Sequence, residues 1–242
     1  MLCVQVFFLK PNAITTITAT SPYQGFGETA PYLGQGEYEI FPDTVDGILD
    51  KPVFVVDGFD PGDTNTIPTF YASLTYGVGQ NLADYLRTQG FDIILVNFPT
   101  YTRPNTTTVV DGGVDFIQRN AFVLVEIINQ INAQKVGNQK NVIIGPSMGG
   151  LISMYAICEY PEVFGAAACI STHWPGIFAV ENNPIPEAFY AYMKKKLPNP
   201  KTNRIYFDYG DQTLDALYPP LQKKADAVMV EKGYTSKNWT TQ

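Results

Sequence analysis

Short apolar runs, each closed by glycine or proline, recur through the middle of this chain and constrain its fold more than any other feature. They are PVFVVDG at 52–58, FDIILVNFP at 91–99 and NVIIGP at 141–146. Each is rich in β-branched residues, which is typical of a strand buried on both faces of a sheet. Two further strands are expected at 165–171 and 204–210.

Helical patterns separate these runs. Apolar residues recur at helical spacing in 79–90 and 114–134, and further helices are expected from the residue after Ser147 to Tyr160 and from about Ala216 to Lys232. Strand and helix therefore alternate. We expect an α/β fold with a mostly parallel central sheet, right-handed crossovers and flanking helices.

The ends of the chain add less regular segments. Near the N-terminus, AITTITATSP at 13–22 and GEYEIFP at 36–42 predict an antiparallel pair of strands that leads into the sheet. Residues 175–200 are rich in proline and are interpreted as an excursion from the sheet. A chain of 242 residues can bury a core without disulfides, so we expect one domain over 1–242, with a small cap or pocket excursion at about 172–200.

Charge and composition narrow the classes of partner. Acidic residues outnumber basic ones by 23 to 16, and the net charge of −7 disfavours a nucleic-acid partner. The apolar opening, MLCVQVFFLK, is too short for a membrane span and lacks the features of a signal peptide. Cys3, Cys158 and Cys169 lack metal-ligand spacing and are compatible with a reducing compartment, which slightly favours a cytoplasmic location.

A G-x-S-x-G pattern lies between an expected strand and an expected helix, in the residues Gly145-Pro146-Ser147-Met148-Gly149. A serine on so sharp a turn requires glycine two residues to either side, and the turn exposes its hydroxyl as a nucleophile. The helix N-terminus directs free N–H groups at the site where negative charge develops in acyl transfer. Met148 N–H is the expected first oxyanion donor, although a tight glycine turn with an incidental serine remains an alternative.

The loop after the first apolar run is the expected source of the second oxyanion donor. Gly58 allows a turn there, and the N–H of Phe59 is then able to face the same pocket. An acidic surface turn is the alternative. Asp57, Asp60 and Asp63 lack the alternate-residue spacing of a calcium loop, and Pro61 interrupts them, so no metal or other cofactor is expected.

These motifs resemble the α/β-hydrolase superfamily from about residue 50 onward. The resemblance to bacterial lipase-like hydrolases is carried by three segments: DGFDPGD, NLADYLRTQGFDIILVNFP and GPSMGGLIS. Three later segments resemble esterases of the esterase D and enterochelin esterase type: YPEVFGAAACIS, RIYFDYGDQTLDALYPP and VEKGYTSKNWTTQ. The resemblance implies a triad in the chain order serine, acid, histidine, with the acid after the seventh strand and the histidine after the eighth.

Asp215 best matches the acid of the esterase pattern, with Asp211 as the second choice and helix capping as the alternative role for both. No histidine follows NWTTQ, so the resemblance indicates a fold shortened at its C-terminal end. His173 is the single histidine of the sequence and follows the strand beside the nucleophile strand. It is therefore the candidate base, or else it lines the acyl pocket while the base is missing.

The sequence thus predicts a serine carboxylesterase in which Ser147 attacks a small-molecule ester, His173 transfers the proton and Asp215 orients the imidazole. Aromatic and apolar residues after 172 either form a pocket for short or medium acyl chains or pack in the core: Trp174, Ile177, Phe178, Phe189 and Tyr190. A thioesterase or acyltransferase and a non-catalytic binding protein with an incomplete triad are the alternatives. The sequence does not predict an oligomeric state.

Overall fold

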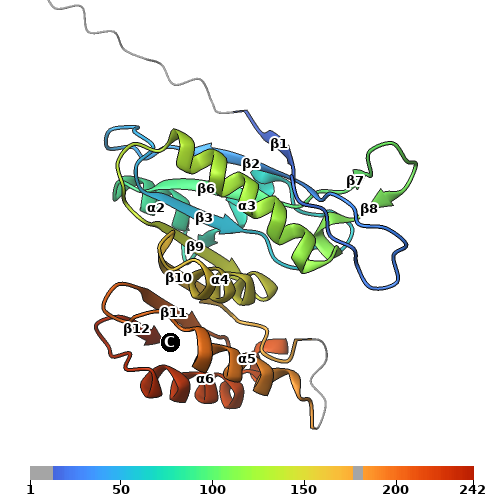
Figure 1. Cartoon of the computed structure of the whole chain (residues 1–242). Coiled ribbons are helices and arrows are strands. Elements are labelled where there is room, and N and C mark those ends of the chain that lie inside the picture. Colours follow the sequence, from blue (N-terminus) through green and yellow to red (C-terminus); the bar gives the residue numbers. More distant parts are fainter. Residues whose placement is uncertain (1–12, 177–181) are drawn as a thin grey trace, which may run out of the picture.

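The computed structural model of the chain describes residues 13–176 and 182–242. An eight-stranded sheet runs through it in the order β1-β2-β6-β3-β9-β10-β11-β12 (Figure 1). The strands are β1 (Thr15–Thr18), β2 (Gln35–Phe41), β3 (Pro52–Val56), β6 (Asp92–Asn97), β9 (Asn141–Pro146), β10 (Phe164–Ile170), β11 (Arg204–Asp208) and β12 (Trp239–Thr241). β2 pairs antiparallel with β1 and with β6, and the remaining neighbours are parallel. The expected α/β fold with a mostly parallel sheet is confirmed.

Helices and short ribbons complete the described elements. The helices are α1 (Ile67–Ser73), α2 (Leu82–Thr88), α3 (Ile117–Gln134), α4 (Met148–Glu159), α5 (Ile185–Lys196) and α6 (Pro219–Glu231), with 3-10 turns η1 (Gly112–Val114) and η2 (Thr213–Leu217). β4 (Thr75–Tyr76) pairs with β5 (Gln80–Asn81), and β7 (Tyr101–Thr102) pairs with β8 (Val109–Val110).

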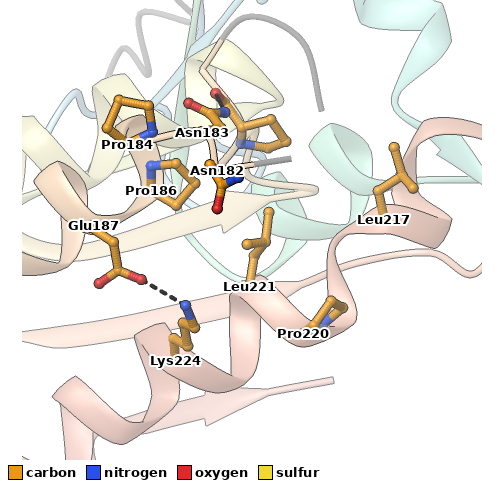
Figure 2. Close-up of a pocket in the computed structure, with 10 residues that line it drawn as sticks. Asn182, Asn183, Pro184, Pro186, Glu187, Leu217, Pro220, Leu221 and Lys224 are labelled. Atoms are coloured by element: carbon orange, nitrogen blue, oxygen red, sulfur yellow. Dashed lines mark hydrogen bonds and ion pairs between the residues drawn. The ribbon is translucent and has the colours of Figure 1, made fainter. Parts of the chain in front are cut away.

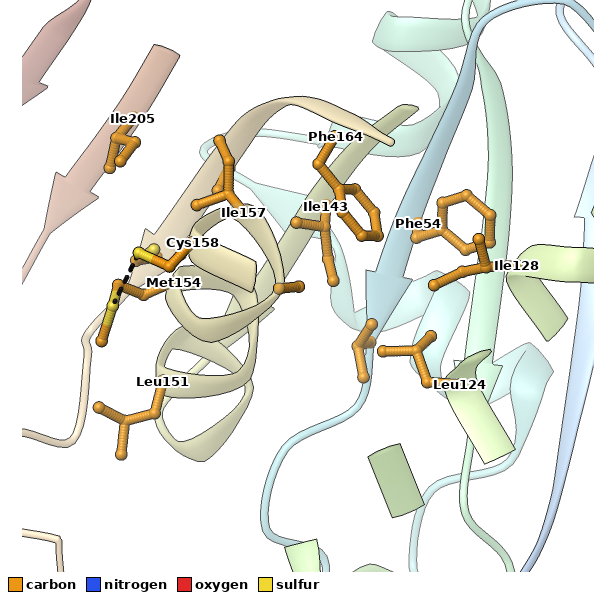
Figure 3. Packing of buried hydrophobic residues seen from close by; sticks show 14 of the residues in the cluster. Phe54, Leu124, Ile128, Ile143, Leu151, Met154, Ile157, Cys158, Phe164 and Ile205 are labelled. Carbon is orange, nitrogen blue, oxygen red and sulfur yellow. Dashed lines mark hydrogen bonds between the residues drawn. The ribbon is translucent and has the colours of Figure 1, made fainter. Parts of the chain in front are cut away.

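The central strands are buried on both faces, as the apolar runs predicted. In β3, Val53 and Val55 belong to a cluster with α1 and α2, whereas Phe54 and Val56 belong to a larger cluster with α3 and α4. On this second face Phe54 and Ile143 of the sheet lie near Leu124 of α3 (Figure 3). Alternate side chains of one strand therefore fix a helical layer on each face.

Two helices differ from the sequence-based expectation. α5 lies inside the Pro-rich segment because Pro186 stands in its first turn, where proline removes no helical hydrogen bond, and three lysines, Lys194 to Lys196, occupy its last turn. α1 was not expected; a capping box between Thr66 and Thr69 stabilises its first turn. A helix thus lies where the sequence predicted only a proline-rich excursion from the sheet.

Candidate active site

Ser147 occupies a sharp turn between β9 and α4. Its backbone has φ 54° and ψ −112°, a region that a residue with a side chain rarely adopts. The turn is closed by glycines, because a Cβ added at Gly145 would lie 2.5 Å from the carbonyl carbon of Gly149. The Ser147 N–H donates to Ile170 O of the neighbouring strand at 2.8 Å. The strain is thus held by contacts on both sides of the serine.

The loop after β3 packs directly against this turn. A Cβ at Gly58 would lie 3.1 Å from Pro146 O, and one at Gly149 would lie 3.2 Å from Val56 O. Asp57, which is 7% exposed, accepts hydrogen bonds from Gly58 N at 2.9 Å and from Asn65 Nδ2 at 3.3 Å. Burial nevertheless raises the pKa of Asp57 above its ordinary value.

The two expected oxyanion donors border one cavity. A hollow of about 210 Å³ is lined by Met148 at the start of α4 and by Gly58 and Phe59 of the β3 loop. The N–H of Met148 belongs to the first helical turn, which has no internal acceptors. Among the described residues, no acceptor takes the N–H of Met148 or of Phe59. Both groups are therefore available to a ligand in this cavity.

His173 lies beside the serine turn at the carboxyl edge of the sheet. Its N–H donates to Ser147 O at 3.2 Å, which ties the two residues through the backbone. The side chain is buried, and its Nδ1 is hydrogen-bonded to Tyr218 Oη at 2.8 Å. Within residues 13–176 and 182–242, no hydrogen bond reaches Ser147 Oγ. A hydrogen bond between a nucleophile and its general base is often long without substrate and shortens when substrate binds.

Tyr218 is the partner of the imidazole that the sequence did not reveal. It precedes the proline pair that begins α6, is 1% exposed, and its N–H donates to Asp215 O at 2.9 Å. Burial, with Asp215 nearby, raises the pKa of Tyr218 to about 12, so the phenol is protonated at neutral pH. No local sequence pattern marks this side chain as the partner of the imidazole.

The acidic residues after β11 are placed differently from one another. Asp215 lies in η2, and its Oδ2 accepts Ser171 Oγ at 2.6 Å and Gly210 N at 3.0 Å. Asp211 is exposed and accepts Gln212 Nε2 at 3.0 Å. Asp208, at the end of β11, accepts Ser171 N at 3.1 Å, and burial raises its pKa, with the Asp215 charge adding to the effect. Asp215 and Asp208 thus meet at Ser171, two positions before His173.

Trp174 is packed in the core. It is fully buried, donates from Nε1 to Gln222 Oε1 at 2.8 Å and contacts the rings of Phe189, Tyr190 and Phe207. Tyr190 is buried too, at 4% exposure. These contacts favour packing over an acyl pocket for Trp174 and Tyr190. Ile177 and Phe178 lie outside the described residues.

A second hollow of about 670 Å³ lies between the start of α5 and α6 (Figure 2). Pro175 and Leu217 line it, each one residue from the buried pair Trp174 and Tyr218. Figure 2 shows Glu187 and Lys224 facing each other across it, joined at 2.6 Å. Ser147 and Met148 do not line this hollow.

The described residues contain neither a cluster of metal-ligating side chains nor a membrane-spanning helix. No three or more His, Cys, Asp and Glu side chains there converge as metal ligands would. Among the described helices, none has both the length and the apolar character that crossing a bilayer requires.

The sequence profile of the α/β-hydrolase fold matches residues 67–223. That span covers more than half of the chain and includes the serine turn, the histidine and the acidic residues after β11. The chain belongs to the α/β-hydrolase fold family. The expected resemblance to this family is therefore confirmed.

Solved structures of esterases have the same fold as this α/β-hydrolase. A ferulic acid esterase superposes with a TM-score of 0.57 at 13% identity, covering 96% of this chain and 90% of its own. The enterobactin esterase of Shigella flexneri gives 0.54 at 16% identity, covering 95% of this chain and 52% of its own. An IroE-like serine hydrolase from Shewanella oneidensis gives 0.56 at 15% identity, covering 95% and 72%.

At these identities the likeness concerns the fold. The chain spans about half the length of the enterobactin esterase. Comparison with curated protein sequences finds no significant match.

Proposed function

We propose that this α/β-hydrolase is a serine carboxylesterase that acts on small-molecule esters through an acyl-enzyme. Ser147 Oγ attacks the ester carbonyl, and the alkoxide leaves with a proton. The Met148 and Phe59 N–H groups stabilise the negative charge that develops on the carbonyl oxygen. Water then hydrolyses the acyl-enzyme and regenerates the serine.

The strained turn at Ser147 carries this proposal. Backbone strain of this size persists where the surrounding structure enforces it, and such sites are commonly functional. The residue after Ser147, Met148, lines a cavity together with Phe59, and the N–H groups of these two residues have no acceptor among the described residues. Esterases recur among the proteins of the same fold. A glycine turn with an incidental serine would require neither the strain nor the free donors.

We assign the proton transfer to His173. The residue is held by Ser147 O through its backbone, and its Nδ1 is hydrogen-bonded to Tyr218 Oη. We assign its Nε2 to the transfer of the serine proton. Tyr218 would act as a positioning residue. We retain Asp215 as the proposed acid. Its carboxylate accepts a hydrogen bond from Ser171 Oγ, and its backbone carbonyl accepts the N–H of Tyr218, so it helps to position the residues around the imidazole.

Hydrolysis of p-nitrophenyl acetate and butyrate by four proteins tests the assignment: the wild type, Ser147→Ala, His173→Ala and Ser153→Ala. Removing a nucleophile from such a site costs on the order of 10⁶ in turnover. His173→Ala should lose nearly as much, because members of one triad act as a unit. Ser153 is a buried serine on α4, so Ser153→Ala is the matched control and should retain activity.

The pH profile separates the histidine from other bases. If His173 accepts the serine proton, turnover should fall at acidic pH, where a protonated imidazole no longer accepts that proton. An active enzyme whose turnover barely changes on His173→Ala would contradict the assignment of the base while leaving the serine in place. Parallel assays with thioesters and with alcohol acceptors distinguish an esterase from a thioesterase or an acyltransferase.

One observation favours a binding protein as the second candidate. His173 Nδ1 is bonded to a neutral phenol, whereas a triad acid would hold it by a carboxylate. A protein that binds esters without turnover, and whose Ser147→Ala variant binds them equally well, would support this second candidate.

A further inference from the structure

The 210 Å³ cavity beside Met148 is lined by a residue with a buried acceptor that no described residue satisfies. Asn120 of α3 lines this cavity and is 8% exposed. Its Nδ2 donates to Gly112 O at 2.8 Å, which fixes the orientation of the amide, because the flipped form would place two oxygens together. Its Oδ1 is buried and has no hydrogen-bond partner among the described residues. A buried acceptor without a partner costs free energy, so we infer that a donor on a bound ligand pairs with this atom.

The other polar side chains that line the cavity are acceptors too. Asp57 and Asp115 line it, and Asp115 is held by Arg119 Nη1 at 2.5 Å, by Phe116 N at 2.8 Å and by Tyr101 Oη at 3.0 Å. The remaining lining side chains are apolar, among them Phe98 and Ile152, and no described Lys, Arg or His contributes. A neutral ligand group with a hydrogen-bond donor is therefore favoured in this cavity, because an anionic group would be repelled by the two carboxylates.

The walls of the cavity are fixed in place by contacts between loops. Asp60 N donates to Gly113 O at 3.3 Å, Gly62 N donates to Asp111 Oδ2 at 2.7 Å, and Thr100 N donates to Asp63 Oδ2 at 2.9 Å. These bonds join the segments that follow β3 and β6 and that precede α3. The cavity is therefore preorganised, which favours a role in recognition.

Its volume limits what it holds. An apolar protein cavity of roughly 150 Å³ accommodates benzene, so 210 Å³ suits a ring of that size with a small substituent or an aliphatic chain of similar volume. We propose that this cavity is the acyl subsite, and that it selects a short neutral acyl group carrying a hydroxyl, which donates to Asn120 Oδ1. This proposal rests on the proposed esterase function, since it uses the same serine.

Matched esters test the selection. The p-nitrophenyl esters of β-hydroxybutyrate and isovalerate differ by hydroxyl against methyl, as do those of ω-hydroxyhexanoate and heptanoate. In at least one pair the wild type should favour the hydroxylated ester by roughly tenfold in kcat/KM, the ratio that one hydrogen bond to a neutral group supports. The p-nitrophenyl hemisuccinate should be the poorest of the set.

The variant Asn120→Leu removes the acceptor at similar volume. The ratio within the pair should fall to about one, and a ratio is insensitive to a general loss of folded enzyme. Asn129→Leu, at an exposed asparagine of the same helix, should keep the wild-type ratio. Equal rates within every pair, or a preference unchanged in Asn120→Leu, would overturn the proposal and assign Asn120 Oδ1 to a buried water.

Ligand binding to the Ser147→Ala variant tests the selectivity of the subsite independently of catalysis. β-Hydroxybutyramide and isovaleramide are titrated into the variant and into Ser147→Ala/Asn120→Leu, followed by protein NMR. Preference for the hydroxylated amide that depends on Asn120 supports the subsite even if the wild type hydrolyses no ester. No preference in an enzyme that hydrolyses esters refutes the subsite and leaves the esterase proposal standing.

Discussion

Gly145→Ala would test whether the geometry of the serine turn governs activity. The new Cβ would lie 2.5 Å from both C and O of Gly149 and 2.8 Å from its Cα. Ordinary contacts between carbon atoms are about 3.5–4.0 Å, so roughly 1 Å of overlap must be relieved. The obstructing atoms belong to the backbone, which means that the first turn of α4 has to move away from β9.

That movement would displace the Met148 N–H and Ser147 Oγ together. Displacements of about 1 Å at reacting groups cost on the order of 10² in rate, while overpacking of this kind typically costs about 1–3 kcal/mol of stability. We therefore expect kcat/KM for p-nitrophenyl butyrate to fall about 100-fold in a protein that still folds at room temperature.

Gly165→Ala is the matched control, since Gly165 lies in the neighbouring strand β10 and its new Cβ would meet Lys140 side-chain atoms at 3.1 Å or more. It should lose at most a few-fold in rate. Urea unfolding of both variants separates lost activity from lost structure. If Gly145→Ala retained wild-type kcat/KM, the proposal that this tight turn positions the nucleophile would be refuted.

Three further outcomes follow from the residues around the site. Asp215→Asn should lower turnover more than Asp211→Asn, because Asp215 holds Ser171 and the η2 backbone that carries Tyr218, and equal small losses would leave both as capping residues. Arg119→Met should lower the free energy of unfolding by roughly 3–5 kcal/mol, because the fully buried guanidinium pairs with Glu28 and Asp115; an unchanged urea midpoint would contradict this. Because the folded pKa of Asp208 is raised, its contribution to stability is largest below the unfolded pKa and is lost as pH rises through the folded value. The unfolding free energy of the wild type relative to Asp208→Asn should therefore increase from neutral pH down to about pH 4, and a flat difference would refute the burial argument.

Much of the fold was predictable because local signals agreed with tertiary packing. The three apolar runs became β3, β6 and β9, since strands buried between two helical layers must be apolar on both faces, and the two further expected strands became β10 and β11. The antiparallel pair β1 and β2 was also predicted, and Thr15 to Thr18 pair with Tyr38 to Gln35. α5 was missed because proline disfavours a helix interior but not the first turn, and local composition does not distinguish these positions.

The candidate site was less predictable. G-x-S-x-G marks Ser147 because the turn imposes a local steric requirement on the glycines that flank the serine. Tyr218 and Asn120 carry no such local pattern. Their roles depend on the three-dimensional meeting of η2 with the β10 loop and of α3 with the β3 loop, so only the folded structure reveals them.

The central claim is that Ser147 is an activated nucleophile, and covalent labelling measures this directly. The protein is treated with a fluorophosphonate, digested with trypsin and sequenced by tandem mass spectrometry. Lys140 and Lys194 bound a peptide that contains Ser147, Ser153 and Ser171, so fragment ions must locate the adduct. We predict a single stoichiometric phosphonyl group on Ser147 that is absent from Ser147→Ala. Folded protein that remains unlabelled, or that carries the group on another serine, would contradict the claim.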